Sequence, residues 1–460
     1  MESVEADIEL VEKYNISGPR YTSYPTAVQF READRGDISD LERYLAERNR
    51  LPRELSLYFH IPFCFSLCWY CGCTKFITKD QSRGDRYIDF LEREMDLIAP
   101  QFHPESRVRQ IHFGGGTPTF LNPDQLVRLG RAINQRFRLD DRVEFGVEID
   151  PRRTTRDHIR ALNVIGCNRA SLGVQDTNPD VQKAVHRVQP FEQTRRVAEW
   201  LREEGIRSLN IDLIYGLPLQ TLANLDKTLK DTLSLDPDRF AVYSYAHLPQ
   251  LMPAQRLLNR EELPPAGEKL KMMMHAIERL TGRGYEYIGM DHFASREDEM
   301  ARALRANTLQ RNFQGYSTHG GTDLYAFGMS GISSVGSRYW QNSKNLEEYY
   351  EALEQGQKPL FKYLSLTRDD RIRREVIMHL MCKTVVKFSL IEKRFQICFR
   401  TYFEEELNRL KELELDGLIE MKEDRILINK QGRLFLRNIA IIFDRYFRET
   451  GASGTYSKTV

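Results

Sequence analysis

Six short apolar runs, each followed by a stretch of helical periodicity, limit the possible folds of this sequence more than any other feature. β-Branched and aromatic residues dominate the runs, and turn or polar residues end them. Strands that alternate with helices form parallel sheets joined by right-handed crossovers. The alternation therefore predicts an α/β fold. The runs span residues 57–61, 110–113, 145–149, 170–174, 209–214 and 240–245.

The residues that follow these runs distinguish two parallel architectures. An open doubly wound sheet gathers its functional residues at one switch point. A barrel places them at the C-terminal end of each successive strand. Because chemically distinctive residues follow most of the runs here, we favour a partial (β/α)6 TIM-like barrel. These features are the cysteine loop 64–73, the glycine run 114–116, Glu148, Gln175, Asp212 and residues 243–247.

Two flanking regions differ in character from the central units. Residues 15–30 are rich in Gly, Pro, Ser, Thr and Tyr, which predicts an extended segment. From about Leu366 the apolar positions take helical spacing as far as residue 447, with a small β-hairpin expected around 418–429. We therefore predict three parts: an N-terminal extended segment (1–36), a catalytic domain (37–362) and a mainly helical C-terminal domain (363–460).

Charge and cysteine usage narrow the class of protein. The 67 basic and 66 acidic side chains balance, which argues against a broad nucleic-acid-binding surface. The acidic N-terminus lacks the apolar core of a secretory signal, and the most apolar late stretch, 439–443, is too short to span a bilayer. Clustered cysteines indicate a metal site in a reducing compartment. We expect a cytoplasmic monomer with no membrane span.

Four of the seven cysteines lie between residues 64 and 73. Cys64, Cys68 and Cys71 have the spacing C-x3-C-x2-C, and three thiolates on a four-iron cluster leave one iron open to a small molecule. The alternative is a zinc site with Cys73 as fourth ligand. No second Cys or His pair follows at zinc-module spacing, and the step from Cys71 to Cys73 is an awkward bite for one tetrahedral ion. The spacing favours the cluster.

Other residues at the ends of the runs allow two interpretations each. The glycine run 114–116 is either a tight turn or a place where the backbone approaches a ligand. Glu148 is either a surface carboxylate or a partner for an ammonium or hydroxyl group. Arg187 is either a solvated helix residue or a ligand contact. Asp212 lies inside an apolar strand, where a carboxylate needs partners, so function is favoured there.

Ten motifs spread along the chain support a more specific interpretation. They are SGPRYTSYPTA, YFHIPFC, CWYCGC, HFGGGTPT, VEIDP, GVQD, NIDLIYGLP, YAHLP, GMDHFA and NFQGY. Together they resemble the oxygen-independent coproporphyrinogen III oxidase family of the radical S-adenosylmethionine (SAM) superfamily, from about residue 10 to the C-terminal end. The resemblance implies a [4Fe-4S] cluster on Cys64, Cys68 and Cys71, with Cys73 outside the ligand set, and two bound SAM molecules.

The resemblance also implies which residues contact the two SAM molecules. Tyr58, Gly115 and Glu148 match contacts to the first molecule. Tyr58 and His60, which strand alternation places on one face, are the expected catalytic residues. The remaining matches are Tyr70 (where the family commonly has Phe), Gly116, Thr117, Gln175, Arg187 and Asp212 for the second molecule, and Ala246 and Ile332 as backbone or apolar contacts.

The implied reaction is oxidative decarboxylation of two propionates of coproporphyrinogen III to vinyl groups, which gives protoporphyrinogen IX in haem biosynthesis. It needs an electron donor for the cluster and an electron acceptor that the sequence does not identify. The segment with Arg20, Tyr21 and Tyr24 is expected to cover the substrate, with Arg20 pairing with a substrate carboxylate. His292 and Arg311 are further candidates for that task.

Two alternatives share the cluster loop. Haem-binding chaperone-like relatives keep the cysteines without oxidising coproporphyrinogen, and a radical methyltransferase would act on another substrate. The SGPRYTSYP segment and Cys73 favour the oxidase, because the chaperone-like relatives resemble the first poorly and tend to carry Phe at the second position.

Overall fold

Six parallel strands in chain order form the centre of a sheet that has 13 strands within the described residues. The computed structural model describes residues 8–450 and 456–459, so residues 1–7, 451–455 and 460 of the two predicted terminal parts lie outside it. Each predicted apolar run falls in one of the central strands, except that the last run extends one residue past its strand, to Tyr245. The central strands are β2 (Glu54–Ile61), β5 (Arg107–Gly115), β6 (Leu139–Ile149), β7 (Arg169–Gln175), β8 (Ser208–Tyr215) and β9 (Arg239–Ser244).

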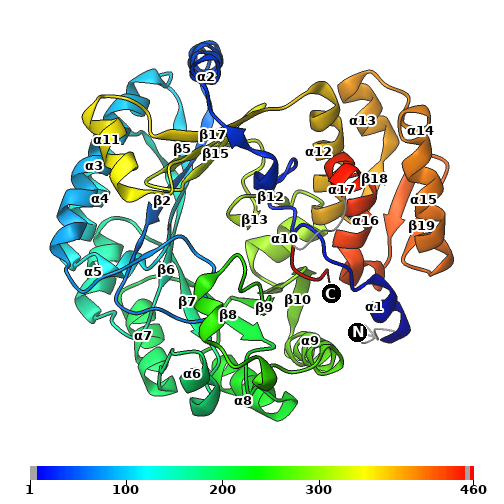
Figure 1. Ribbon diagram of the computed structural model, residues 1–460, viewed down its shortest axis with the longest axis horizontal. Coiled ribbons are helices and arrows are strands. Elements are labelled where there is room, and N and C mark those ends of the chain that lie inside the picture. Colours follow the sequence, from blue (N-terminus) through cyan, green and yellow to red (C-terminus); the bar gives the residue numbers. More distant parts are fainter. Residues whose placement is uncertain (1–7, 451–455, 460) are drawn as a thin grey trace.

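Helices cover the outer face of this curved sheet (Figure 1). In α3 (Ser82–Ile98), Tyr87, Leu91 and Met95 are buried at four-residue steps, as the helical periodicity after the first run predicts. Because the helices lie outside the arc, the partial barrel is confirmed over the open doubly wound sheet. The other outer helices are α4 (Pro123–Arg136), α5 (Arg156–Val164), α6 (Pro179–Ala184), α7 (Phe191–Glu203), α8 (Leu222–Leu233) and α9 (Ala266–Thr281).

The sheet continues on both sides beyond the six predicted strands. β14 (Asp323–Phe327) pairs in parallel with β2, and antiparallel strands follow it to one edge. Antiparallel β11 (His292–Ser295) and β10 (Tyr285–Gly289) extend the other edge from β9. The strands beyond β14 are β15 (Ile332–Val335), β16 (Arg338–Asn342), β17 (Leu360–Ser365) and β1 (Arg31–Glu32).

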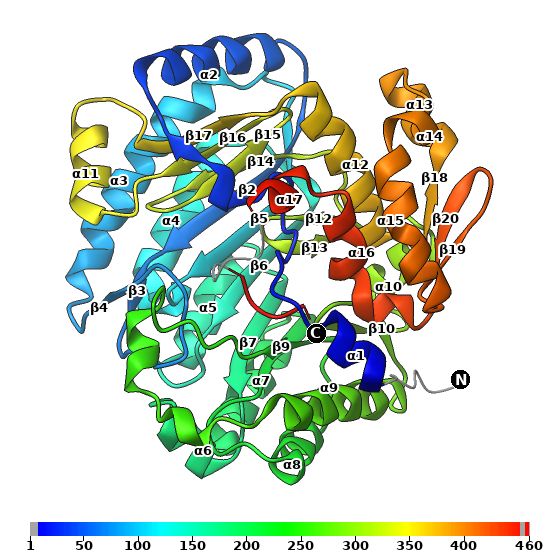
Figure 2. The same ribbon diagram turned by 45° about the vertical axis from the view of Figure 1, so that its right-hand side comes forward.

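Shorter elements complete the barrel region. Figure 2 shows α2 (Arg35–Arg48) lying across the β14–β17 side of the sheet, where Arg48 bonds Asp323. The hairpin of β12 (Gln310–Asn312) and β13 (Gly315–Ser317) forms its own two-stranded sheet. The remaining elements are β3 (Phe63–Cys64), β4 (Phe76–Ile77), α10 (Glu299–Arg305), α11 (Leu346–Glu354), and the 3-10 turns Ala27–Gln29, Ala99–Gln101, Pro118–Phe120, Pro253–Leu257 and Arg260–Glu262.

The N-terminal segment has no helix or strand from residue 15 to residue 26 and bends at residues 22–25; it follows a helix α1 (Ile8–Tyr14) that the sequence did not predict. Buried Arg437 donates hydrogen bonds to the carbonyls of Gly18 and Pro19, and Arg311 donates one to the carbonyl of Tyr21. The segment is therefore held between the C-terminal helices and the β12–β13 hairpin.

The C-terminal part is mainly helical, and the predicted hairpin is present as β19 (Ile419–Met421) and β20 (Arg425–Ile428). A third strand, β18 (Val385–Lys387), pairs with β20. None of the helices in the described ranges combines the length and apolarity needed to cross a membrane. The helical elements are α12 (Arg368–Cys382), α13 (Phe388–Phe395), α14 (Phe399–Tyr402), α15 (Glu404–Leu415), the 3-10 turn Gly432–Phe435, α16 (Leu436–Ile442) and α17 (Arg445–Thr450).

Candidate active site

A cavity of about 470 Å³ opens at the C-terminal ends of the parallel strands. Its walls come from the cysteine loop after β2 and from the last residues of β5 to β9. The strand ends meet there because all the central strands run in the same direction. The cavity brings together twelve of the residues singled out from the sequence: Cys64, Cys68, Tyr70, Cys71, Gly115, Gly116, Thr117, Glu148, Gln175, Arg187, Asp212 and Ala246.

The cysteine loop is closed at its base by pairing of β3 with β4. Cys64 and Cys71 are half-buried, Cys68 is buried and Cys73 is exposed. A side-chain hydrogen bond with Cys73 lowers the pKa of the Cys71 thiol to about 6, whereas burial raises the pKa of Cys64 to about 11. The loop therefore presents thiols in unlike surroundings to one cavity.

The donor set suits a cluster better than a single ion. The sulfur ligands of one zinc ion all lie about 2.3 Å from the same centre. Cys64, Cys68 and Cys71 line one cavity. An iron–sulfur cluster binds its thiolates through separate iron atoms, so three cysteines around one cavity fit it.

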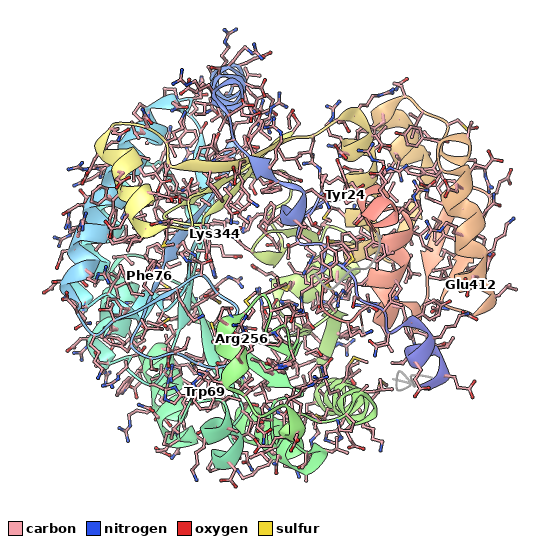
Figure 3. The ribbon with its side chains drawn as sticks, viewed as in Figure 1. Tyr24, Trp69, Phe76, Arg256, Lys344 and Glu412 are labelled. Atoms are coloured by element: carbon pink, nitrogen blue, oxygen red, sulfur yellow. The ribbon has the colours of Figure 1, made fainter. Side chains whose placement is uncertain are left out.

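Two guanidinium groups stand beside the sulfur of Cys68. Arg152 Nη2 lies 3.4 Å and Arg187 Nη1 lies 3.5 Å from Cys68 Sγ. Both guanidinium groups are placed to donate a hydrogen bond to this sulfur. Trp69, labelled in Figure 3, stacks on His186 with ring centroids 5.3 Å apart and so fixes the loop against the turn after α6.

Asp150 links these two arginines and was not singled out from the sequence. Arg152 Nη2 donates to it over 2.6 Å and Arg187 Nη1 over 3.3 Å. Burial alone would raise the pKa of Asp150, but the two guanidinium groups lower it to about 2. The VEIDP motif holds Asp150 two residues after Glu148, and this was the signal available in the sequence.

Glu148 joins the ends of β5 and β6. Its Oε2 accepts a hydrogen bond of 3.1 Å from the backbone N–H of Gly115, and its Oε1 lies 3.4 Å from His112 Nε2. The side chain is nevertheless 46% exposed, so its second face remains open to a ligand.

The glycine run packs against the exit of β2. A Cβ on Gly115, whose φ is 112°, would lie 2.5 Å from His60 Cε1. A Cβ on Gly116 would lie 2.7 Å from the carbonyl carbon of Pro62. The close approach that these glycines permit is therefore, at least in part, to the protein's own chain.

Asp212 lies on β8 with two hydrogen-bond donors. Ser171 Oγ donates over 2.6 Å and Asn210 Nδ2 over 2.8 Å. Burial raises the pKa of this carboxyl to about 6. The carboxylate thus has two partners within the protein, neither of which the sequence singled out, and its role toward a ligand stays a prediction.

Tyr58, His60 and Ile332 lie in an adjoining cavity of about 320 Å³, which Lys344 (labelled in Figure 3) also lines. Glu148 lines both cavities. His60 Nε2 lies 3.0 Å from the carbonyl oxygen of Thr74, and Nδ1 lies 3.1 Å from Tyr58 Oη. Burial lowers the pKa of His60. Because a carbonyl only accepts, the neutral ring carries its proton on Nε2, and Nδ1 accepts from the Tyr58 hydroxyl.

Of the three residues expected to bind substrate carboxylates, Arg20 alone has a carboxylate partner within the described residues. Arg20 forms an ion pair with Asp291, and its guanidinium lies 5.6 Å from the Tyr243 ring centre. His292 contacts the rings of Tyr243 and Tyr316, and burial lowers its pKa to about 3.

Arg311 hydrogen-bonds the carbonyl of Tyr21, and both Tyr21 and Tyr24 are fully buried. The segment predicted to cover the substrate is therefore packed into the fold at these two tyrosines.

Residues 58–232 match the radical SAM superfamily, and residues 366–435 match the HemN C-terminal domain. The oxygen-independent coproporphyrinogen III oxidase of Pseudomonas aeruginosa is 45% identical over 448 residues, 97% of each chain. That of Escherichia coli is 44% identical over 461 residues, 100% of each chain. The solved structure of coproporphyrinogen III oxidase (HemN) from Escherichia coli, a radical SAM enzyme, superposes with a TM-score of 0.90 at 43% identity, covering 97% of this chain and 100% of that one.

Proposed function

The chain belongs to the oxygen-independent coproporphyrinogen III oxidase family, and on that premise we propose that its cavity carries out the family's reaction. Two propionate side chains of coproporphyrinogen III are oxidatively decarboxylated to vinyl groups, which gives protoporphyrinogen IX in haem biosynthesis. The observation that carries this function is the meeting of Cys64, Cys68 and Cys71 with Glu148 at the strand ends, in a chain alignable with the Escherichia coli relative over its whole length.

The family implies a [4Fe-4S] cluster and SAM. Cys64, Cys68 and Cys71 would hold the cluster, with Arg152 and Arg187 compensating the negative charge beside Cys68. When bound, the two groups supply radical abstraction of hydrogen from an unactivated carbon. The chain's own part is to position the reactants and to exclude water.

We assign the polar residues of the cavity to two SAM molecules. Glu148 and Asp212 support this assignment, because each carboxylate has its own donors and can meet a separate cationic group. The first molecule would contact Tyr58, Gly115 and Glu148. The second would contact Tyr70, Gly116, Thr117, Gln175, Arg187 and Asp212, and Ala246 and Ile332 would add backbone or apolar contacts.

Tyr58 and His60 are assigned as the catalytic residues. The hydrogen bond from Tyr58 Oη to His60 Nδ1 holds a proton between a half-buried ring and a buried one beside Glu148. The bond from Nε2 to Thr74 fixes the orientation of the imidazole. The pair can therefore hold a substrate edge in a fixed position and keep water away from it.

We also propose the compartment, the oligomeric state and the division of the chain into parts. We assign the chain to the cytoplasm, as a monomer made of the three parts 1–36, 37–362 and 363–460. Free thiols at the cysteine loop support a reducing compartment. The reaction requires an electron donor for the cluster and a separate acceptor for the electrons taken from the substrate.

An anaerobic assay tests the function directly. Reconstituted protein is mixed with coproporphyrinogen III, SAM and a reductant, and the products are oxidised and separated by chromatography with fluorescence detection. We expect protoporphyrin from the wild type, none from Cys68→Ser, and wild-type amounts from Cys398→Ser, a matched change at an exposed thiol of the C-terminal part. Absence of product together with stoichiometric haem binding would favour the chaperone-like alternative.

A further inference from the structure

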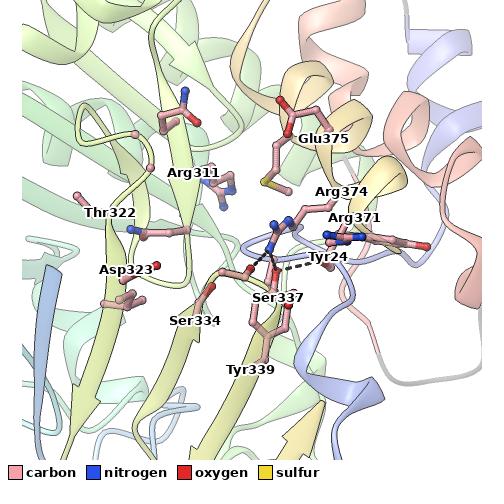
Figure 4. Close-up of a pocket in the computed structure, with 18 of the residues that line it drawn as sticks. Tyr24, Arg311, Thr322, Asp323, Ser334, Ser337, Tyr339, Arg371, Arg374 and Glu375 are labelled. Atoms are coloured by element: carbon pink, nitrogen blue, oxygen red, sulfur yellow. Dashed lines mark hydrogen bonds between the residues drawn. The ribbon is translucent and has the colours of Figure 1, made fainter. Parts of the chain in front are cut away.

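A second, larger cavity of about 840 Å³ lies between α12 and the strands β12, β14, β15 and β16. Figure 4 shows Arg371 and Arg374 reaching into it from α12, with Arg311 facing Arg374 and with Thr322 and Asp323 on the far wall. A volume of this size is typical of small-molecule sites. None of the residues assigned to the cluster or to SAM lines it.

The walls of this cavity carry an excess of positive charge. Within the part of the chain that the structure describes, five of the lining cations form no ion pair with a carboxylate. Asp323 and Glu375, the two carboxylates in the walls, already have partners: Arg48 contacts Asp323 through two bonds of 2.7 Å, and Arg394 lies 2.6 Å from Glu375. The five cations are Arg311, Arg368, Arg371, Arg374 and Lys383.

Arg311 is buried, and a buried charge without an ion-pair partner is energetically unfavourable. It is only 9% exposed, and its Nη1 is buried with no hydrogen-bond partner in the described structure. Its Nε donates to the carbonyl of Tyr21 over 3.1 Å, and its guanidinium lies 4.6 Å from the Tyr316 ring centre. A buried guanidinium without a carboxylate is destabilising unless an anion completes its hydrogen bonds.

Arg374 is fixed in a similar way on the opposite wall. Its Nη1 donates to the carbonyl of Gly336 over 2.9 Å and to Tyr339 Oη over 3.1 Å. Arg371, one turn earlier on α12, has no hydrogen-bond or ion-pair partner for its side chain among the described residues. Planar guanidinium groups held by neutral acceptors are suited to bidentate binding of carboxylates.

The basic cavity adjoins the active site. Phe313 and Leu324 line both the basic cavity and the cavity of Tyr58, His60 and Glu148. A ligand in the basic cavity would therefore lie next to the residues assigned to catalysis.

From this arrangement we infer that the basic cavity is a docking site for the carboxylates of a tetrapyrrole, separate from the cluster cavity. The inference rests on the proposed function, because the substrate of the family carries a propionate on every pyrrole ring. Arg371, Arg374, Arg311 and Lys383 form the anion-binding wall, and Phe313 and Leu324 line the side shared with the cavity of Tyr58 and His60.

Coproporphyrin III, a stable fluorescent polycarboxylate, is the probe for this site. Anaerobically reconstituted holoprotein is titrated with it in three forms: wild type, Arg371→Gln/Lys383→Gln, and the control Arg142→Gln/Arg283→Gln. The control removes the same charge from two exposed positions outside both cavities. We expect the Kd of the cavity variant to rise about tenfold or more and that of the control to stay within about twofold.

Steady-state kinetics distinguishes docking from structural damage. We expect the cavity variant to raise KM for coproporphyrinogen III with little change in kcat or Tm. An unchanged Kd and KM in the cavity variant would overturn the docking site. Binding of inorganic pyrophosphate as tight as that of coproporphyrin, with full displacement of the probe, would show a general anion site and would also overturn it.

The experiments can contradict the docking site and the proposed function independently of each other. If the wild type binds the probe and the cavity variant does not, yet the wild type makes no protoporphyrinogen, the docking site stands and the function is wrong. If the wild type is active and the cavity variant matches it in Kd and KM, the function stands and the docking site is wrong.

Discussion

The backbone N–H of Gly115 donates a hydrogen bond of 3.1 Å to Oε2 of Glu148. Gly115 is the last residue of β5, and Glu148 is the next-to-last residue of β6. The bond therefore connects the ends of two neighbouring strands at the cavity. It also orients the carboxylate, whose other oxygen lies near His112 and whose surface is partly open. A ligand with a cationic group would meet a carboxylate already fixed in place.

The first prediction concerns this carboxylate. Glu148→Gln keeps an oxygen that can accept from Gly115 but removes the charge, so we expect the Kd for SAM to rise about tenfold. Calorimetric titration of cluster-loaded protein with SAM measures the change. Cluster content should be unaffected, and the exposed control Glu297→Gln should bind as the wild type does. Wild-type affinity in Glu148→Gln would remove Glu148 from the assigned contacts.

The second prediction separates the members of the cysteine loop. Serine at Cys64, Cys68 or Cys71 should lower iron and acid-labile sulfide to background, because each change removes one thiolate. Cys73→Ser should leave both intact, since Cys73 is exposed and its contact with Cys71 Sγ includes a backbone N–H that the substitution keeps. Loss of iron in Cys73→Ser would show that the ligand set is misassigned.

The third prediction tests whether close packing against the backbone requires glycine at position 116. In Gly116→Ala the new Cβ would meet the carbonyl carbon of Pro62 at 2.7 Å and the carbonyl oxygen of Phe63 at 2.9 Å. Backbone atoms cannot rotate away, so we expect a loss of about 2 kcal/mol in unfolding free energy and a lower cluster content. Denaturant unfolding and iron analysis give the two readouts.

Gly267→Ala is the matched control for this change. Gly267 lies in the first turn of α9, and a Cβ there would meet no atom within 4 Å. Alanine should leave stability unchanged or raise it slightly, because it favours the helix. Equal effects of the two substitutions would contradict the packing explanation.

The fourth prediction uses the buried carboxyl of Glu94. Its oxygens accept from the N–H of Gly328 and Asn342 Nδ2, each over 2.7 Å, and from Tyr349 Oη over 2.8 Å. Burial outweighs these donors and raises the pKa from its ordinary 4.5 to about 7. A raised pKa in the folded state means that the contribution to stability is complete below about pH 4.5 and is lost as the pH rises through about 7.

Glu94→Gln removes this titration. The Tm of the wild type should therefore fall relative to that of the variant between about pH 5 and pH 8. At full ionisation of Glu94 the corresponding loss in unfolding free energy is roughly 3 kcal/mol. Thermal melts of both proteins across this range are the measurement. A Tm difference that does not change with pH would show that Glu94 keeps one protonation state throughout.

Much of the barrel and of the cluster loop could be predicted from the sequence. The six central strands and the buried positions of α3 follow from local periodicity, because a residue's burial repeats with the geometry of its own element. The meeting of the cysteine loop, the glycine run, Glu148 and Asp212 follows from the common direction of the strands. Motif resemblance, and not periodicity, supplied the assignments of Gln175, Arg187, Ala246 and Ile332, which remain proposals.

Only the tertiary structure decided which distant segments meet. β1 pairs with β17, placing Arg31 opposite Tyr363, and no local pattern encodes such a partner. Arg20, expected to bind substrate, is paired with Asp291, a partner 271 positions away in the chain. The unpaired arginines of α12 become a candidate site only because the β12–β13 hairpin and β14 close the cavity opposite them. Periodicity records how each segment is buried, whereas the pairing of charges and the shape of a cavity depend on contacts between segments far apart in the chain.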